Sequence, residues 1–473
     1  MIFSSYSFLL SFLPVVWLGF MVLRWLFQES PALRSMLLFW LLGSSLWFYS
    51  QWYLPDLAVL VAVVVVNYLA ALIGRGKAKY FALSVIVLAN LSVLAVFKYW
   101  PWLGAGQDRM ALLAGLPLGI SFYIFQAIAF QVDLSRGLTK LPKWADFAVF
   151  LSFFPQLIAG PIVQGRQLLP QLARLHVARC CIGLGFTLLI MGLSKKVLVA
   201  DSFAGGVDAI YAGEHAINLV TTLAGAFGYG VQLYFDFSGY ADMAVGLGLL
   251  FGLRLPQNFR RPYTAPSLAA FWRRWHITLS AFLREYLYIS LGGNRLGLLR
   301  RNLNLLVTMI LGGLWHGAGL QFLLWGVLHG GLLAVEQTFR QWLPSAGRTI
   351  PRCIKMALTV SVVMLLWIPF RAANLDDAAW LLSGLANWTS PEWPDISMLM
   401  QPVWEVSSDT SSPATVLFWS VITLAMAATR PTTWRWALVS GPIKRGVVSG
   451  FLLLVVLKTL ADRPEQPFLY FQF

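Results

Sequence analysis

Long apolar runs separated by short polar segments make up most of the chain, and they determine its expected fold. A transmembrane helix needs about 20 largely apolar residues to cross a hydrocarbon core about 30 Å thick. The first such runs extend from Ser7 to Phe27, Leu33 to Leu54, Leu57 to Ile73, Tyr80 to Phe97 and Leu112 to Val132. No basic stretch precedes the first run and no clear small-x-small cleavage site follows it, so we interpret it as a retained helix.

The apolar runs in the middle of the chain are shorter and contain glycine and proline. The stretch from Phe147 to Pro161 is too short to cross a bilayer and is predicted to be re-entrant. Irregular backbone at membrane depth is tolerated only inside protein or beside a water-filled cavity, so a functional site is expected in this part of the chain. Further apolar helices are expected at Ile182–Val199, Leu219–Phe235, Ala241–Leu253, Leu303–Leu314, Phe322–Val335, Met356–Phe370, Thr415–Ala428 and Val447–Leu460.

These runs predict an all-α, polytopic integral membrane protein with about eleven or twelve spans. We expect one integral domain over residues 1–473, with N-terminal helices in 1–135, a core in 145–340 and further helices in 350–473. Composition supports a membrane protein, because 58% of the residues are hydrophobic and only 12% are charged. A soluble domain carries about 25% charged residues.

The charge of the chain is strongly positive, with 35 Lys and Arg against 20 Asp and Glu and a formal net charge of +15. The basic residues lie in short clusters between apolar runs, which suits membrane orientation and contact with anionic lipid rather than nucleic acid. The connection from Arg136 to Lys143 is basic, whereas Gln51 to Asp56 has no Lys or Arg; only the segment with Lys98 and Arg109 blurs the alternation. The N-terminus is therefore predicted to lie outside the cytoplasm.

The chain has three cysteines, and Cys180 and Cys181 are adjacent. This set provides neither a disulfide framework nor a four-ligand zinc site. No metal site is predicted, and other residue types must carry any chemistry.

The segment from Ala270 to Ile289 is predicted to be an amphipathic helix rather than a span. Its apolar residues recur at spacings of three and four, and its charged residues take other sides of the helix. The simplest interpretation is an interfacial helix whose arginines contact lipid phosphate, and we favour it over a cofactor-binding role. The apolar set is Trp272, Trp275, Leu279, Phe282, Leu283 and Tyr286, and the charged set is Arg273, Arg274, Arg284 and Glu285.

Two histidines are candidate functional residues. His276 lies at the edge of that apolar face, where an ionisable side chain is either functional or a satisfied structural histidine. His316 lies in the glycine-rich segment LGGLWHGAGL, where the backbone permits close approach of a ligand or a helix break. A desolvated His316 would stay neutral and could accept a proton from a hydroxyl, although a packing notch explains the same residues. His329 is thirteen positions further on, about 220° round a continuous helix, so it is not paired with His316.

Asp236 and Asp242 lie in the apolar stretch QLYFDFSGYAD, where an unpaired carboxylate is costly. They could orient a histidine, line a polar tunnel, or pair with arginine in a structural clamp. The structural clamp is slightly favoured.

The combination of FWRRWHITLSAFLREYLYISLGGNR, NLLVTMILGGLWHGAGLQFLLWG, QLYFDFSGYADMAVGLGLLFG and IAGPI closely resembles the membrane-bound O-acyltransferase (MBOAT) family. Within that family the chain is most similar to the bacterial membrane subunits that acetylate alginate and cellulose. The similarity extends from FSSYSFLLSFLP at the start to FLYFQF at the end. His316 matches the family's catalytic histidine in the WHG motif, and His276 in RRWH matches the second, upstream histidine of the bacterial branch.

The resemblance implies a ring of helices around a thinned centre, with a funnel from the cytoplasm meeting an outer cavity near His316. It implies an inner-membrane enzyme that uses acetyl-CoA, holds no permanent cofactor, and works with a periplasmic SGNH-type acetyltransferase and other exopolysaccharide synthesis or export subunits. Arg273, Arg274 and Arg295 would attract the coenzyme A phosphates, with lipid phosphate as the alternative for each.

Two other classes of function remain open on the residues alone. A transporter or flippase also has broken helices and a midplane site, and a scaffold of a polysaccharide export complex would leave the histidines structural. Within the family, a D-alanyl or long-chain acyl transferase is the nearest alternative.

Overall fold

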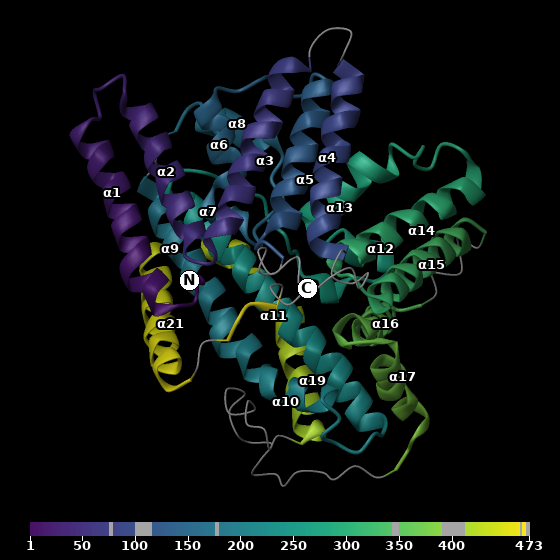
Figure 1. Cartoon of the computed structure of the whole chain (residues 1–473). Helices are drawn as coiled ribbons and strands as arrows, with labels where there is room; N and C mark the ends of the chain where they lie inside the picture. The colour runs from purple at the N-terminus through teal and green to yellow at the C-terminus, as the bar shows by residue number, and fades with distance from the viewer. Residues whose placement is uncertain are drawn as a thin grey trace. The chain divides into compact units, whose positions relative to one another are not determined.

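The computed structural model describes residues 1–74, 79–99, 116–175, 179–342, 350–389, 412–463 and 466–469, and its regular structure in these ranges is helical (Figure 1). The predicted all-α fold is therefore confirmed. Arg109 and the start of the run expected from Leu112 lie outside the described residues. The chain forms two compact units, each described separately below. The expected single domain over 1–473 stays a prediction.

The first unit comprises Met1–Met191, Tyr240–Gln257 and Ser440–Gly450. Its polar side chains join helices inside the apolar core: the amides of Asn67 and Asn90 exchange hydrogen bonds of 3.1 and 3.0 Å, and Gln131 donates to the Asn67 carbonyl at 2.7 Å. Such bonds hold apolar helices together, because lipid offers no competing partner. The helices are η1 (Ser7–Phe12), α1 (Leu13–Leu26), α2 (Leu33–Ser50), α3 (Leu54–Ile73), α4 (Lys79–Tyr99), α5 (Ile120–Ser135), α6 (Trp144–Ser152), α7 (Phe154–Leu157), α8 (Gly165–Leu172) and α9 (Arg179–Ser194).

The segment predicted to be re-entrant forms two short helices, α6 and α7, which break at Phe153. Residues 146–164 are buried, and α6 has only 9 residues, so neither helix is long enough to cross a bilayer. Their break follows from Pro155, which cannot donate to a continuous helix.

The second unit comprises Gly192–Gly239, Asn258–Val439 and Phe451–Phe473. The helices α9, α11 and α21 belong partly to each unit by these bounds. The elements are η3 (Lys195–Ala200), α10 (Asp201–Tyr211), α11 (Leu219–Leu250), η4 (Pro262–Thr264), α12 (Leu268–Trp272), α13 (Ile277–Phe282), η5 (Leu283–Tyr288), α14 (Gly297–His316), α15 (Leu320–Trp342), α16 (Arg352–Arg371), α17 (Leu375–Ser383), η6 (Gly384–Ala386), α19 (Pro413–Thr429), α20 (Thr433–Val439) and α21 (Pro442–Asp462).

Six helices in the described residues are long and apolar enough to cross a membrane, or seven if the bent pair α19 and α20 forms one span. The protein is therefore a multi-pass membrane protein, but fewer helices meet this criterion than the eleven or twelve spans expected. Part of the difference comes from helices that are too short or too polar. The helix α5 has 16 residues, and α14 begins with Arg300 and Arg301 in its first turns.

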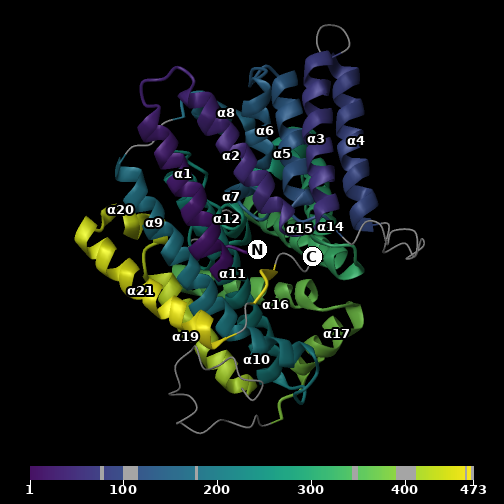
Figure 2. The ribbon, with the colours of Figure 1, turned by 60° about the vertical axis from the view of Figure 1, so that its left-hand side comes forward.

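The hairpin of α14 and α15 is closely packed, and both views show the two helices side by side (Figures 1 and 2). Glycines permit this approach: a Cβ atom at Gly313 would lie 2.3 Å from the Phe322 carbonyl oxygen, and one at Gly326 would lie 2.5 Å from that of Met309. The close contact fixes the end of α14, and therefore His316, against α15.

This packing predicts opposite effects of one substitution at two glycines of α15. Gly326→Ala should destabilise the protein by about 1–3 kcal/mol, because the new methyl group overlaps backbone of α14. Gly331→Ala is the matched control, since nothing lies within 4 Å of its Cβ position, and it should stabilise by about 0.5–1 kcal/mol through helix propensity. Thermal unfolding of both variants in the same detergent measures the difference, and equal midpoints would contradict the close approach.

The predicted amphipathic helix over 270–289 is not continuous. The helix α12 ends at Trp272, His276 has a left-handed backbone (φ 41°), and α13 begins at Ile277. The prediction of one helix was wrong because residues 258–260 form hydrogen bonds with the backbone at the break. The Arg260 N–H donates to the Arg274 carbonyl, and the Ile277 N–H donates to the Asn258 carbonyl, both at 2.9 Å.

Most of the apolar side chains of that segment lie inside the protein: Trp275, Leu279, Phe282 and Leu283 are buried, and Trp272 and Tyr286 are half-buried. The Trp275 ring lies 5.0 Å from that of Trp367 between centroids. The three- and four-residue spacing correctly indicated a shared apolar face, and part of that face packs in the core, where Trp275 contacts α16.

Candidate active site

His316 is the last residue of α14 and is buried among aromatic rings. The helix ends there because Gly317 has an extended backbone, and a Cβ atom at Gly317 would lie 2.0 Å from the Phe322 ring. The imidazole centroid lies 4.8 Å from that of Trp315, 5.3 Å from Trp325 and 5.0 Å from Phe370. The helix break expected at this glycine-rich segment is therefore present, and it places a titratable side chain in apolar surroundings.

His276 is also buried, at the break between α12 and α13. Its ring lies 4.7 Å from Phe237 and 6.1 Å from Trp315. Burial lowers the pKa of His276 to about 3, so the imidazole is neutral at physiological pH. A left-handed backbone at a non-glycine residue costs roughly 1–2 kcal/mol, and such strain is concentrated at functional sites.

The structure brings the two predicted histidines to the same indole, because Trp315 contacts both His316 and His276. This proximity comes from tertiary packing, since the two residues belong to different elements. A neutral imidazole can accept a proton at one ring nitrogen and donate a hydrogen bond from the other.

His329, which the sequence did not pair with His316, belongs to the same aromatic cluster. The assumption of one continuous helix was wrong, because α14 ends at His316 and α15 begins at Leu320. The Trp325 ring contacts both histidines, at 5.3 Å from His316 and 4.7 Å from His329. The Trp272 indole N–H donates to Nδ1 of His329 at 3.3 Å.

Several arginines lie near the break after α12. Desolvation lowers the pKa of the Arg274 guanidinium, and three nearby cations lower it further. These cations are Arg352, Arg273 and Arg261. Arg274 itself donates to the carbonyl and hydroxyl oxygens of Thr264 at 3.1 and 3.0 Å. Repulsion among these charges favours a bound anion. Arg295, predicted to act with Arg273 and Arg274, lies instead on the exposed turn before α14.

Asp236 is held in an ion-pair clamp, as the sequence favoured, but the partner is lysine rather than arginine. Nζ of Lys196 lies 2.8 Å from Asp236 and 2.6 Å from Asp201, and it donates to the Pro467 carbonyl at 3.1 Å. The Leu469 N–H donates to the other Asp236 oxygen at 2.9 Å. The clamp therefore fixes residues 466–469. Asp242, by contrast, falls in the first unit.

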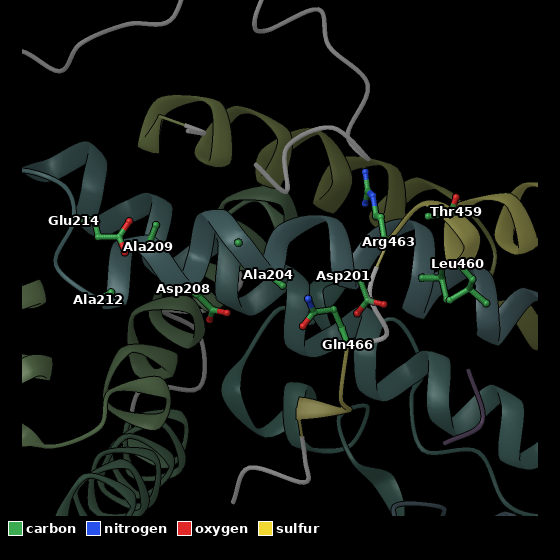
Figure 3. Close-up of a pocket in the computed structure, with 12 residues that line it drawn as sticks. Asp201, Ala204, Asp208, Ala209, Ala212, Glu214, Thr459, Leu460, Arg463 and Gln466 are labelled. Carbon is green, nitrogen blue, oxygen red and sulfur yellow. The ribbon is translucent and has the colours of Figure 1, made fainter. Parts of the chain in front are cut away.

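A cavity of about 390 Å³ lies beside this clamp, between α10 and the end of α21. Figure 3 shows Asp201 and Asp208 along α10, Glu214 after it, and Arg463 on the other wall. Neither His276 nor His316 lines this cavity, so the histidine cluster is a separate site. The second wall includes Thr459 and Leu460.

The fold and the buried histidine pair define a multi-pass membrane protein with acid–base groups in its apolar interior. The chain belongs to the membrane-bound O-acyltransferase family, whose family model matches residues 23–373. It is therefore an acyltransferase, rather than the transporter or scaffold that the residues alone left open.

Three curated relatives are similar over most of the chain. The probable alginate O-acetylase of Pseudomonas putida is 35% identical over 100% of both chains, and that of Azotobacter vinelandii is 41% identical over 82% of this chain and 79% of its own. The peptidoglycan O-acetyltransferase of Helicobacter pylori is 36% identical over 82% of this chain and 80% of its own.

Proposed function

We propose that the protein takes acetyl from cytoplasmic acetyl-CoA and passes it across the bacterial inner membrane for O-acetylation of an exopolysaccharide, alginate or cellulose. The relatives support acetylation of a sugar polymer, since they are named for O-acetylation of alginate and of peptidoglycan. The observation that carries the proposal is the buried imidazole of His316, which ends α14 among Trp315, Trp325 and Phe370.

In the proposed reaction, His316 acts as general base on the acceptor hydroxyl, and that oxygen attacks the thioester carbonyl carbon. The neutral imidazole of His276 orients or polarises the thioester from the other side of Trp315. The apolar rings exclude water, which favours transfer of the acetyl group over hydrolysis.

The acceptor in this proposal is a hydroxyl of a periplasmic SGNH-type acetyltransferase, which then modifies the polymer together with other synthesis and export subunits. The charge pattern supports an N-terminus in the periplasm and basic connections in the cytoplasm, next to anionic lipid. Mass spectrometry of the polymer from wild-type and deletion strains identifies the substrate. An unchanged acetyl content of the cell's alginate, cellulose and peptidoglycan would contradict the proposal.

Direct evidence for the activity would be acetyl transfer from labelled acetyl-CoA by the purified protein and its periplasmic partner. Transfer is expected with the wild-type protein and not without it. Failure of the purified pair to consume acetyl-CoA, while a different acyl donor is used, would overturn the donor assignment.

Arg273 and Arg274 are proposed to bind the coenzyme A phosphates, and Arg261 and Arg352 are further cationic neighbours of Arg274. Guanidinium groups suit phosphate because they donate in a planar fork. The same role for Arg295 stays a prediction.

Arg273→Gln should therefore raise the KM for acetyl-CoA by about fivefold at low salt, since one exposed charge contact contributes about 1 kcal/mol. The kcat should change little, because the phosphates lie away from the reacting carbonyl. Arg295→Gln serves as the matched comparison, and its KM should change less. A larger effect at Arg295 than at Arg273 would assign the phosphates to the turn before α14 instead.

A further inference from the structure

The proton of the His329 imidazole can be assigned to one nitrogen. His329 is fully buried, and Nδ1 accepts the indole N–H of Trp272 at 3.3 Å. An indole nitrogen can only donate, so Nδ1 carries a lone pair and the ring is neutral. The remaining ring proton is therefore on Nε2.

Two buried N–H groups of α15 lack an acceptor among the residues that the structure describes. They are Nε2 of His329 and Nε1 of Trp325, whose side chain is 1% exposed. An unpaired buried donor is unfavourable, because it has lost its hydrogen bonds to water. Such a cost is expected at a place where a ligand supplies the acceptor.

Trp325 lies next to the proposed general base, and His329 lies next to Trp325. Trp325 and His329 are one helical turn apart on α15, with ring centroids 4.7 Å apart, and Trp325 also contacts His316 at 5.3 Å. The ring of Phe370 contacts His316 at 5.0 Å and Trp325 at 5.3 Å, which closes the same cluster. The donors therefore share the water-poor surroundings in which a hydrogen bond to a developing charge is strongest.

We propose that Nε2–H of His329 and Nε1–H of Trp325 stabilise the oxyanion formed during acetyl transfer. This inference rests on the proposed function. His316 takes the proton of the acceptor hydroxyl while the hydroxyl oxygen bonds to the thioester carbon. The electron pair of the thioester C=O bond moves onto the carbonyl oxygen. That oxygen accepts hydrogen bonds from both donors. The C–S bond then breaks, the carbonyl re-forms, and the thiolate takes the proton from His316.

A structural role of His329 would use a different ring nitrogen, which makes the two roles separable. Holding Trp272 in place requires the acceptor at Nδ1, whereas stabilising an oxyanion requires the donor at Nε2. Asparagine places its amide near the Nδ1 position and leaves Nε2 empty. Glutamine can place an N–H donor near the Nε2 position.

The test compares kcat and KM of His329→Asn and His329→Gln in acetyl transfer from acetyl-CoA. His329→Asn should lower kcat by about 10²–10³-fold with little change in KM, as expected for loss of an oxyanion donor. His329→Gln should retain activity within about tenfold of wild type, taking one replaced donor as a neutral hydrogen bond of about 1 kcal/mol. The opposite order, or wild-type kcat in both variants, would overturn the proposal.

Trp325→Phe keeps the ring contact with His316 and removes only the N–H, so it decides the question even if the His329 variants do not fold. Its kcat should fall at least about tenfold at unchanged thermal stability, and an unchanged kcat would overturn the proposal. His215→Gln, a histidine outside the cluster, should behave as wild type. An inactive wild-type protein would contradict the proposed function instead, which keeps the two failures distinct.

Discussion

His316→Ala should reduce acetyl transfer by about 10²–10⁴-fold, the contribution of a positioned general base. The imidazole is the titratable group at the end of α14, and its neighbours Trp315, Trp325 and Phe370 offer no substitute base. The loss should appear in kcat, because the base acts on the acceptor hydroxyl during the chemical step. The measurement is transfer from labelled acetyl-CoA by purified, reconstituted protein.

The control for this variant is a measurement of its thermal stability. Removing one imidazole from an aromatic cluster leaves the α14–α15 hairpin intact, so the thermal midpoint of His316→Ala should stay close to that of His316→Gln. Undiminished transfer by a folded, inserted His316→Ala protein would remove His316 from the mechanism and leave the acyltransferase chemistry to another group.

Lys196→Met should destabilise the protein by about 3–5 kcal/mol, the largest effect on stability that we expect. Nζ of Lys196 pairs with both Asp201 and Asp236, and removing it leaves the buried Asp236 carboxylate without its ion-pair partner. The substitution also removes the donor to the Pro467 carbonyl, so residues 466–469 should become accessible to protease. Thermal unfolding in detergent, with limited proteolysis of the C-terminus, measures both results.

A second substitution separates charge from packing in this clamp. Lys196→Met combined with Asp236→Asn should recover part of the lost stability, because one of the unpaired charges is gone. Arg340→Met provides the surface comparison: Arg340 pairs with Glu336 at 2.9 Å but is 53% exposed, so its loss should cost less than about 1 kcal/mol. Equal costs for Lys196 and Arg340 would show that the buried ion pair does not stabilise the fold.

The break at His276 shows why periodicity misled the prediction for residues 270–289. A spacing of three and four positions reports which side chains share a face, and it continues across a short interruption. Whether the backbone stays helical there depends on competing hydrogen bonds, and Asn258 and Arg260 supply them. The sequence marked the histidine, but the strained backbone at His276 became visible only with its partners.

The sequence by itself determined the membrane class, the helical fold, and His276 and His316 as candidates. Apolar run length and glycine content are local properties, so a single chain segment is enough to reveal them. The tertiary structure decided which groups meet. Trp272 and His329 are 57 positions apart and share a hydrogen bond. Asp236 accepts a hydrogen bond from the N–H of Leu469, 233 positions away. Such pairs form because a buried polar group must find a partner within the packed interior, and packing selects that partner from the whole chain.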